Sequence, residues 1–229
     1  MVPTVEVRRA AAPQNDFAPP PLDLDSGFGG LEGDALELVE RRYGDRGLTV
    51  TRERYNSRSQ DGDIVCTARD GDAIVGTLSV RFDGAGGLHA DQLFKAELDE
   101  WRTDGVRLCE FGGLAVDKHS HDPKRVLTQI FHLGYLHAHR RARCERLVVE
   151  VNPRHVGFYR RCLGLIPMSA ARHNPRVQAP AVLMSIDFAT VREQISLWGG
   201  QPELSTATRS LYPLFWDAAT EATMLARLP

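Results

Sequence analysis

Hydrophobic residues in the first half of the chain recur first at helical and then at strand spacing. Apolar side chains repeat every three or four residues over residues 31–43, which predicts an amphipathic helix. Residues 64–68 and 73–80 are β-prone runs, and the Asp-Gly pair between them favours a tight turn. We therefore expect a helix followed by a β-hairpin.

Capping residues divide the middle of the chain into further elements. Asp91 is expected to cap a segment with helical apolar spacing, and residues 106–116 form the next strand-like run. Asp122 is a good capping residue, and it is followed by Pro123, which the first turn of a helix favours. A broad apolar face continues from there, so we predict a long helix that ends near Arg143.

The second half of the chain repeats the alternation of strand and helix. Residues 147–151 form a short apolar strand, and Asn152 and Pro153 repeat the capping pattern at the start of another helix. Residues 182–188 are again strand-like, and the chain turns helical from about residue 190. This order predicts a mixed α/β sheet flanked by helices.

Composition divides the chain into three parts. Residues 1–30 are rich in Pro and Gly and poor in apolar anchors, so we expect a mostly disordered leader. Residues 31–189 are expected to form the α/β domain, and residues 190–229 a helical extension packed on it. An apolar stripe of the extension comprises Leu214, Phe215, Ala218, Ala222 and Leu225. The chain has no run of the roughly 18 apolar residues that a membrane helix needs and no secretory signal, which predicts a cytoplasmic protein.

Charge is distributed unevenly along the chain. The formal net charge is −2, but residues 118–176 carry 12 Lys and Arg against 3 Asp and Glu, a local charge of +9 that leaves −11 for the remainder. Seven of the eight His lie in this window, so its positive charge grows on mild acidification. We expect either a partner with phosphate or an acidic surface, or a plain solvated helix face. Duplex DNA fits poorly, because the whole chain is slightly acidic and has no recognition-helix motif.

The cysteines and histidines do not form metal-binding motifs. Of the helical histidines His132, His137 and His139, only the first and the last share a helix face, and they are too far apart to hold one ion. We therefore expect no metal. The four cysteines are widely spaced and lack the paired Cys-x-x-Cys pattern, so we interpret them as buried thiols in a reducing compartment; they are Cys66, Cys109, Cys144 and Cys162.

Two glycines interrupt the strand predicted over residues 106–116. Gly112 and Gly113 weaken strand pairing, and such positions mark a β-bulge or a close approach of the backbone to a ligand. A bulge would leave backbone N–H groups near residues 114–116 able to bind a thioester carbonyl and then the oxyanion formed from it. A simple kink in the sheet is the alternative.

Three side chains in or after the predicted strands could take part in chemistry. Glu110 either faces solvent or lies in a partly apolar cleft, where it is a usable base. Tyr159 has the spacing of an ordinary core ring, although its hydroxyl needs a partner. Asn152 is fully explained as a helix cap, so a contact to a ligand would be additional.

Two sets of motifs resemble known acyltransferases. The strand with central glycines, the long helix and the run VEVNPRHVGFYRRCLGL, in which Asn152 and Tyr159 are seven residues apart, resemble the GCN5-related N-acetyltransferase (GNAT) fold. Residues 76–117 and 176–188 more narrowly resemble the FeeM-type long-chain N-acyl amino acid synthases, relatives of the acyl-homoserine-lactone synthases. The resemblance covers about residues 31–188 and implies a mixed, splayed central sheet flanked by helices.

This resemblance implies both substrates and the roles of two residues. The donor would be a fatty acyl chain on acyl carrier protein, and the acceptor the α-amine of an amino acid. Glu110 would deprotonate the amine, and Tyr159 would protonate the leaving thiolate. Residues predicted to bind the pantetheine thioester are Gly112, Gly113, Leu114, Ala115, Val116, Lys124, Arg125 and Asn152. Residues predicted to line the acyl pocket are Leu108, Phe111, Val149 and Phe158. A dock for the carrier protein is expected to include Lys124, Arg125, Arg140, Arg141 and Arg143.

Two departures from related families narrow the substrates. Acetyltransferases that grip the pyrophosphate of coenzyme A carry a glycine-containing loop, whereas residues 122–129 contain no glycine, so carrier protein is favoured over coenzyme A. Lactone synthases carry an Arg three residues after the glutamate, where this chain has Gly113, which argues against S-adenosylmethionine as acceptor. We therefore expect transfer of a medium or long acyl group to an amino acid. The alternatives are an acetyl-coenzyme A-dependent N-acetyltransferase and a non-catalytic acyl-binding module.

Overall fold

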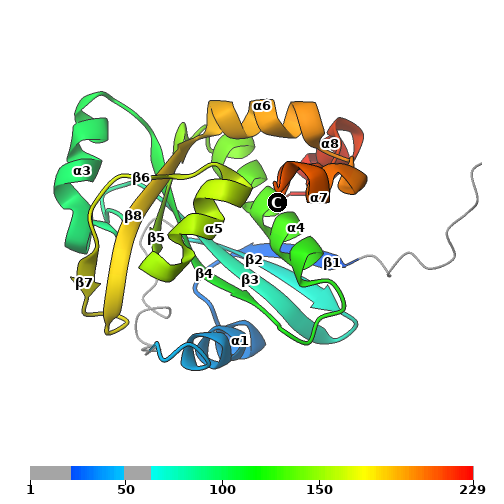
Figure 1. Cartoon of the computed structure of the whole chain (residues 1–229), viewed down its shortest axis with the longest axis horizontal. Coiled ribbons are helices and arrows are strands. Elements are labelled where there is room, and N and C mark those ends of the chain that lie inside the picture. The colour runs from blue at the N-terminus through cyan, green and yellow to red at the C-terminus, as the bar shows by residue number, and fades with distance from the viewer. Residues whose placement is uncertain (1–21, 49–62, 229) are drawn as a thin grey trace, which may run out of the picture.

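A single mixed sheet forms the centre of the molecule (Figure 1). The computed structural model describes residues 22–48 and 63–228. The strands are β1 (Asp23–Phe28), β2 (Ile64–Asp70), β3 (Ala73–Phe82), β4 (Leu108–Val116), β5 (Arg146–Val151), β6 (Ile166–Pro167), β7 (Arg172–Asn174) and β8 (Ala179–Asp187). Their order is β1-β2-β3-β4-β5-β8-β6, and β7 also pairs with β8.

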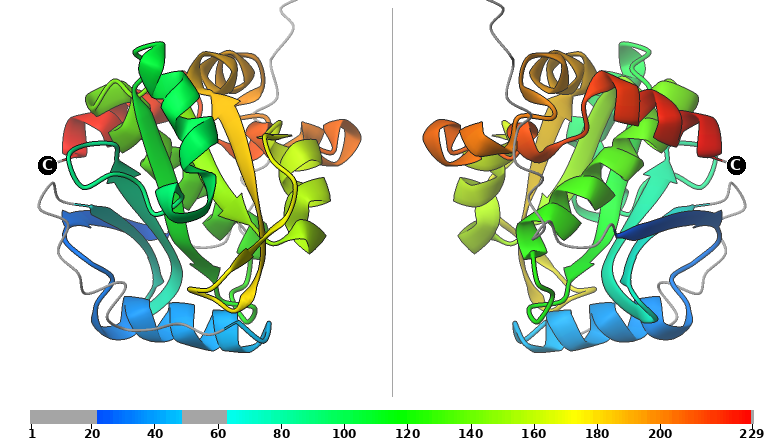
Figure 2. Two further views of the ribbon diagram at one scale, coloured as in Figure 1. Left: turned by 90° about the vertical axis from the view of Figure 1, so that its left-hand side faces the viewer. Right: turned by 90° about the vertical axis from the view of Figure 1, so that its right-hand side faces the viewer.

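Helices cover both faces of this sheet (Figures 1 and 2). They are α1 (Gly33–Gly44), α3 (Asp91–Thr103), α4 (Pro123–Tyr135), η1 (Leu136–Arg141), α5 (Pro153–Leu163), α6 (Phe188–Trp198), η2 (Pro202–Leu204), α7 (Ser205–Thr208), η3 (Tyr212–Leu214) and α8 (Ala218–Arg227). The main apolar core lies between the sheet and α4, α5 and α6. Two smaller clusters lie under α3 and under α1, on the other face. The mixed α/β fold with C-terminal helices is therefore confirmed.

Local sequence signals account for the boundaries of several elements. The side chain of Asp122 accepts a hydrogen bond from the N–H of Arg125 at the start of α4, and Asn152 does the same for Arg154 at the start of α5. Gly164 ends α5 in the left-handed conformation, with φ of 78°. The hairpin of β2 and β3 turns at Gly71, which has φ of 58°. These capping and turn predictions are confirmed.

Two predictions near the ends of elements were wrong. Residues 23–28, which we expected in the disordered leader, form β1 and pair with β2 along its whole length. An edge strand can be held by main-chain hydrogen bonds with few apolar side chains, so composition alone missed it. Asp91 does not cap α3; it is the first residue of the helix, and its side chain accepts from the N–H of Leu88 at 2.7 Å. Residues 1–21 lie outside the described part of the chain.

The C-terminal extension packs on the domain through part of the predicted stripe and through residues outside it. Ala218 and Ala222 are exposed, because α8 turns its small side chains to solvent. The buried contacts come instead from the segment before α8, through Leu211, Tyr212, Phe215 and Trp216. Of the predicted stripe, Phe215 belongs to the main core, and the half-buried Leu214 and Leu225 pack against it.

A buried polar contact ties the extension to α4. Nδ1 of His132, which is fully buried, accepts from the N–H of Trp216 at 3.1 Å, and its Nε2 lies 3.1 Å from Glu221 of α8. Arg140 pairs with the other oxygen of the Glu221 carboxylate. Burial lowers the pKa of His132 despite the neighbouring carboxylate, so the ring serves as a neutral bridge between α4 and α8. His132 thus has a structural role.

The other two histidines of the predicted helix also have local partners. Nε2 of His137 lies 2.9 Å from the hydroxyl of Ser26, and Nδ1 of His139 lies 2.8 Å from the carbonyl of Cys144. Within residues 22–48 and 63–228 there is no group of three or more metal-ligating side chains. In the same part of the chain, no helix is both long enough and apolar enough to cross a membrane.

Strands β4 and β5 separate after a short parallel pairing, and this separation positions the site. All other neighbouring strands are antiparallel, but β4 and β5 run parallel and pair only over Leu108–Glu110 and Arg146–Val148. Beyond Glu110 and Val148 the two strands diverge, which opens the sheet toward their carboxyl ends. The predicted splay of the sheet is therefore present, and it lies beside Glu110.

Candidate active site

A cleft that is open to solvent at its mouth fills the gap between the diverging strands. Its base is formed by residues 110–114 of β4 and 149–151 of β5. The start of α5 and the segment before β8 form one side. Tyr43, Arg46 and Leu48, at and after the end of α1, form the other. Ligands of α/β proteins commonly bind where neighbouring strands part, so this cleft is the candidate active site.

The predicted bulge lies at the base of the cleft. Gly112 pairs with Ser79 and Ala115 with Thr77, so two residues of β4 oppose one residue of β3 between these pairs. Gly113 has φ of 56°, a conformation that favours glycine. The buried hydroxyl of Thr77 donates a hydrogen bond of 2.8 Å to the carbonyl of Gly113, which holds the bulge in place. Sequence analysis missed Thr77, because a threonine in a strand is unremarkable.

Glu110 is buried at the point where the strands part. Its side chain is 3% exposed and accepts a hydrogen bond of 3.1 Å from the N–H of Ala90. Side chains alternate along a strand, and Glu110 lies on the face that carries α1 and α3, opposite Phe111. Of the two positions considered for Glu110, the cleft is therefore the observed one.

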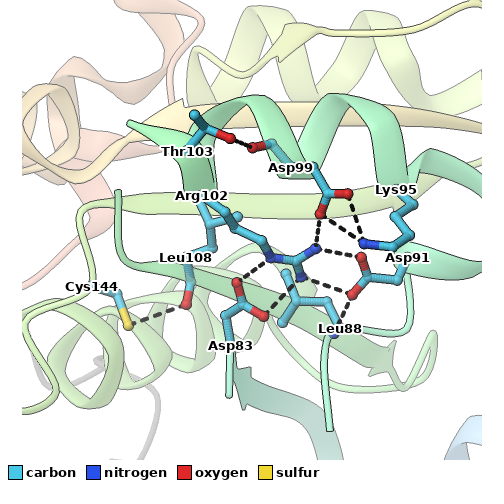
Figure 3. Close-up of polar contacts among 9 residues, drawn as sticks. All are labelled: Asp83, Leu88, Asp91, Lys95, Asp99, Arg102, Thr103, Leu108 and Cys144. Carbon is cyan, nitrogen blue, oxygen red and sulfur yellow. Dashed lines mark hydrogen bonds and ion pairs between the residues drawn. The ribbon is translucent and has the colours of Figure 1, made fainter. Parts of the chain in front are cut away.

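An arginine cluster fixes the loop that contacts Glu110 (Figure 3). Arg102 of α3 binds both carboxylate oxygens of Asp83 and of Asp91, at distances of 2.6–2.8 Å, and also contacts Asp99. Hydrogen bonds to Asp91 and Asp83 raise the pKa of Arg102. Asp83 and Asp91 lie at the two ends of the loop between β3 and α3. The cluster therefore holds in place the backbone N–H of Ala90, which donates a hydrogen bond to Glu110.

Helix α5 presents two ring side chains to the cleft. Tyr159 is half-buried and contacts Phe131 of α4 edge-on, with ring centroids 6.4 Å apart. Burial raises the pKa of Tyr159 to about 12, and the positive charge of Arg46 acts in the opposite direction. Burial and then the charges of Arg46 and Arg154 lower the pKa of His155. At neutral pH the cleft therefore holds a protonated tyrosine and an uncharged imidazole.

The structure brings together only some of the predicted binding residues. Glu110, Tyr159, Gly112, Gly113, Leu114, Asn152, Phe111 and Val149 all line the cleft. Six others do not line it; they are Ala115, Val116, Lys124, Arg125, Leu108 and Phe158.

The packing of these six residues explains why they do not line the cleft. Ala115 packs under α1, and Val116 packs in the main core beyond the bulge. Leu108 faces α3, on the opposite side from Phe111. Phe158 is on the outer side of α5 and 39% exposed. Lys124 is exposed at the start of α4, whereas Arg125 faces grooves beside β1.

A second, almost wholly apolar chamber lies directly behind the cleft. It is a narrow space between the sheet and α4, α5, α6 and η3. Phe111 and Phe131 line both spaces, and their ring centroids are 5.9 Å apart. The far side of the chamber is formed by Tyr212 and Phe215 of the C-terminal extension. The two rings therefore separate a polar cleft from an apolar chamber.

Several polar residues of the cleft escaped sequence analysis. Glu150, Asn174 and Arg176 form one network, in which Arg176 pairs with the Glu150 carboxylate and also donates 2.8 Å to the carbonyl of His89. Arg46 lines the cleft from the turn after α1. Glu150 lies in the predicted strand 147–151, and Arg176 begins a range that carries the resemblance, but neither spacing nor motif indicated that they pair with each other. Asn174 and Arg46 come from a short strand and a turn that no local pattern marks.

A sheet that parts between two parallel strands, with a bulge and a capped helix beside the gap, is the arrangement of the GNAT-like fold. The FeeM structure, of an N-acyl amino acid synthase from uncultured soil microbes, matches the fold with a TM-score of 0.64 at 23% identity, over 75% of this chain and 94% of that one. The AHL synthase LasI matches with a TM-score of 0.52 at 14% identity, over 73% and 91%, and Escherichia coli ElaA with 0.50 at 9%, over 71% and 98%. No curated protein matches the chain.

The family is established by sequence. The family of the N-acyl amino acid synthase FeeM matches residues 34–187, which is well over half of the chain. The protein belongs to this N-acyl amino acid synthase family, and it is an acyltransferase.

We expect Tyr159→Phe to lower kcat by about tenfold or less, because water can replace a general acid in part. The raised pKa of the hydroxyl predicts that it keeps its proton well above pH 10, where ordinary tyrosines ionise. Subtracting the alkaline ultraviolet titration of Tyr159→Phe from that of the wild type isolates this ionisation. A difference spectrum that appears below pH 10 would contradict the raised pKa of Tyr159.

Proposed function

We propose that the protein transfers a medium or long acyl group from the thioester of acyl carrier protein to the α-amine of an amino acid. The observation that carries this proposal is the position of Glu110. It is a buried carboxylate at the point where the sheet parts, with a polar cleft on its own side and an apolar chamber behind Phe111. Such a place suits a base between a polar acceptor and an apolar donor.

The reaction proceeds by direct attack. Glu110 takes a proton from the acceptor amine as the nitrogen forms a bond to the thioester carbon. Backbone N–H groups at the bulge of residues 112–114 stabilise the oxyanion. The carbon–sulfur bond then breaks, Tyr159 protonates the departing thiolate, and the proton held by Glu110 returns through solvent to Tyr159. The products are an N-acyl amino acid and the free thiol of the carrier.

The acyl chain extends past Phe111 and Phe131 into the apolar chamber. In this structure the two rings are in contact, so rotation of one of them joins the cleft to the chamber. An acetyl group would use none of this space. The chamber therefore favours a fatty acyl donor over acetyl-coenzyme A.

Carrier protein is the favoured donor because of exposed cations on α4 and α5, the two helices that contribute side chains to the cleft. Lys124 at the start of α4 and Arg154, Arg160 and Arg161 of α5 are exposed. The first turn of α4 contains no glycine, and the Asp122 carboxylate already occupies one of its N–H groups, so a pyrophosphate has little room there.

The dock predicted from sequence is divided by the structure. Arg140, Arg141 and Arg143 lie at the far end of α4 and η1, about 25 Å along the helix from Lys124, and Arg140 is engaged by Glu221. Only Lys124 and the exposed arginines of α5 are therefore assigned to the dock.

Raising the salt concentration should change the KM for one kind of acyl donor and not for the other. We expect the KM for acyl carrier protein to rise several-fold between about 50 and 300 mM salt, because exposed charges are screened over about 8 Å at physiological ionic strength. The KM for a short acyl-pantetheine thioester should barely change. Lys124→Gln should mimic the salt effect for the carrier protein, and Arg143→Gln, at the far end of the helix, should not. Equal salt sensitivity of both donors would contradict the dock.

The proposed function is tested by offering the enzyme competing donors. Octanoyl, lauroyl and palmitoyl carrier proteins and acetyl-coenzyme A are incubated with a mixture of the twenty amino acids, and the products are identified by mass spectrometry. We expect N-acyl amino acids from the long donors. Acetylated products alone would identify an N-acetyltransferase, and donor binding without any product would identify a non-catalytic acyl-binding protein.

A further inference from the structure

The basic side chains in and beside the cleft differ in whether they are charged and whether a carboxylate already pairs with them. Of the residues that the structure describes, Arg46 is the only lysine or arginine that lines the cleft. Arg176, next to the lining, is paired with the Glu150 carboxylate. His155 has a lowered pKa and is uncharged at neutral pH. No carboxylate in the described part of the chain pairs with Arg46, so Arg46 alone offers a free positive charge there.

The backbone of Arg46 is fixed, although its side chain is exposed. Its N–H donates 2.9 Å to the carbonyl of Tyr43, and its own carbonyl accepts from the guanidinium of Arg154. The next two N–H groups, of Gly47 and Leu48, also donate to backbone carbonyls near the end of α1. The turn therefore presents the arginine from a defined position.

Arg46 lines the same cleft as the two rings that α5 presents to it, His155 and Tyr159. It influences both cleft-facing rings of α5, lowering the pKa of His155 and opposing the rise in the pKa of Tyr159. Arg46 also follows α1, which packs on the same face of the sheet as Glu110. The free charge and the proposed base thus belong to the acceptor side of the cleft, opposite the apolar chamber.

We propose that Arg46 binds the carboxylate of the acceptor amino acid while Glu110 takes the proton from its amine. This inference rests on the proposed function and names the positioning residue for its acceptor. A guanidinium binds a carboxylate through two parallel hydrogen bonds, which fixes the α-carbon between two points and orients the amine toward the thioester. Recognition of the amino acid would then depend on its free carboxylate.

The test compares acceptors that carry a carboxylate with acceptors in which an amide replaces it. Lauroyl carrier protein is the donor, and the acceptors are a mixture of L-amino acids or the matching mixture of L-amino acid amides. We expect Arg46→Gln to raise the KM for the amino acids about 30-fold, the range for losing a hydrogen bond to a charged group, and to change amide acylation less than about twofold. Arg46→Lys should recover part of the loss, because an ammonium keeps the charge without the bidentate geometry.

Controls separate this role from a structural one. Arg41→Gln removes an arginine of α1 that pairs with Asp117 outside the cleft, and it should leave acylation of both acceptors unaffected. If Arg46→Gln lowers acylation of acids and amides equally, or raises the KM for the donor instead, the assignment of Arg46 is overturned. A wild type that acylates neither mixture would overturn the proposed function, whereas an active wild type with an unchanged Arg46→Gln would overturn only the assignment of Arg46.

Discussion

Glu110→Gln should lower kcat/KM about 10²-fold or more while leaving the fold intact. The amide has the shape of the carboxylate and can still accept the hydrogen bond from Ala90, but it cannot take a proton from the amine. The loss should shrink as pH rises, because a larger share of the acceptor then arrives already deprotonated. The measurement is kcat/KM between pH 6.5 and 9.5 for both enzymes.

Two further variants make this result interpretable. Glu110→Asp retains a carboxylate but withdraws it by one methylene, so its activity should fall between the wild type and Glu110→Gln. Glu145→Gln removes a carboxylate on the surface outside the cleft and should have little effect. Activity of Glu110→Gln close to that of the wild type at neutral pH would remove Glu110 from the mechanism.

Val149→Trp should shorten the preferred acyl chain without abolishing transfer. Val149 of β5 lines the base of the cleft and is 4% exposed. The indole ring of a tryptophan at this position would reduce the space between the cleft and the chamber. Each buried methylene contributes about 0.8 kcal/mol, or nearly a fourfold gain in binding, so losing room for several carbons changes the preference between palmitoyl and octanoyl donors by orders of magnitude. The measurement is kcat/KM for octanoyl, lauroyl and palmitoyl carrier proteins.

The neighbouring residue supplies the matched control. Val148 is fully buried in the same strand but faces α3, so Val148→Trp should lower the thermal midpoint by overpacking without changing the chain-length profile of the surviving enzyme. A wild-type profile that is flat, or that peaks at acetyl, would contradict the acyl chamber. A Val149→Trp enzyme that is only less stable would assign Val149 to the ordinary core.

Local signals predicted the fold well, because each acts over a few residues. The Asp-Gly turn, the caps at Asp122 and Asn152, and the glycines at the bulge each work through short-range backbone chemistry that is legible in one sequence. Strand β1 was missed because its stability comes from pairing with β2, some 40 residues later in the chain. Such long-range pairing leaves little trace in local composition.

The site was predicted less completely, for a geometric reason. A strand residue changes sides with every step, and the bulge at Gly113 shifts this alternation, so the face occupied by Leu108, Ala115 or Val116 was not fixed by spacing alone. The same holds for Phe158, since one position along α5 separates it from Tyr159, which faces the cleft. Loop residues such as Arg46 have no periodicity at all, and their approach to the cleft depends on how α1 packs on the sheet.

The chamber behind Phe111 is completed by Tyr212 and Phe215, which belong to the C-terminal extension rather than to the strands that carry Glu110 and the bulge. These two residues lie about 100 residues after Glu110 in the sequence. If the proposed function holds, substitutions at Tyr212 and Phe215 would change which fatty acid is used while the acid–base groups stay as they are. Adaptation to a new lipid supply would then be separable, in part, from preservation of the reaction.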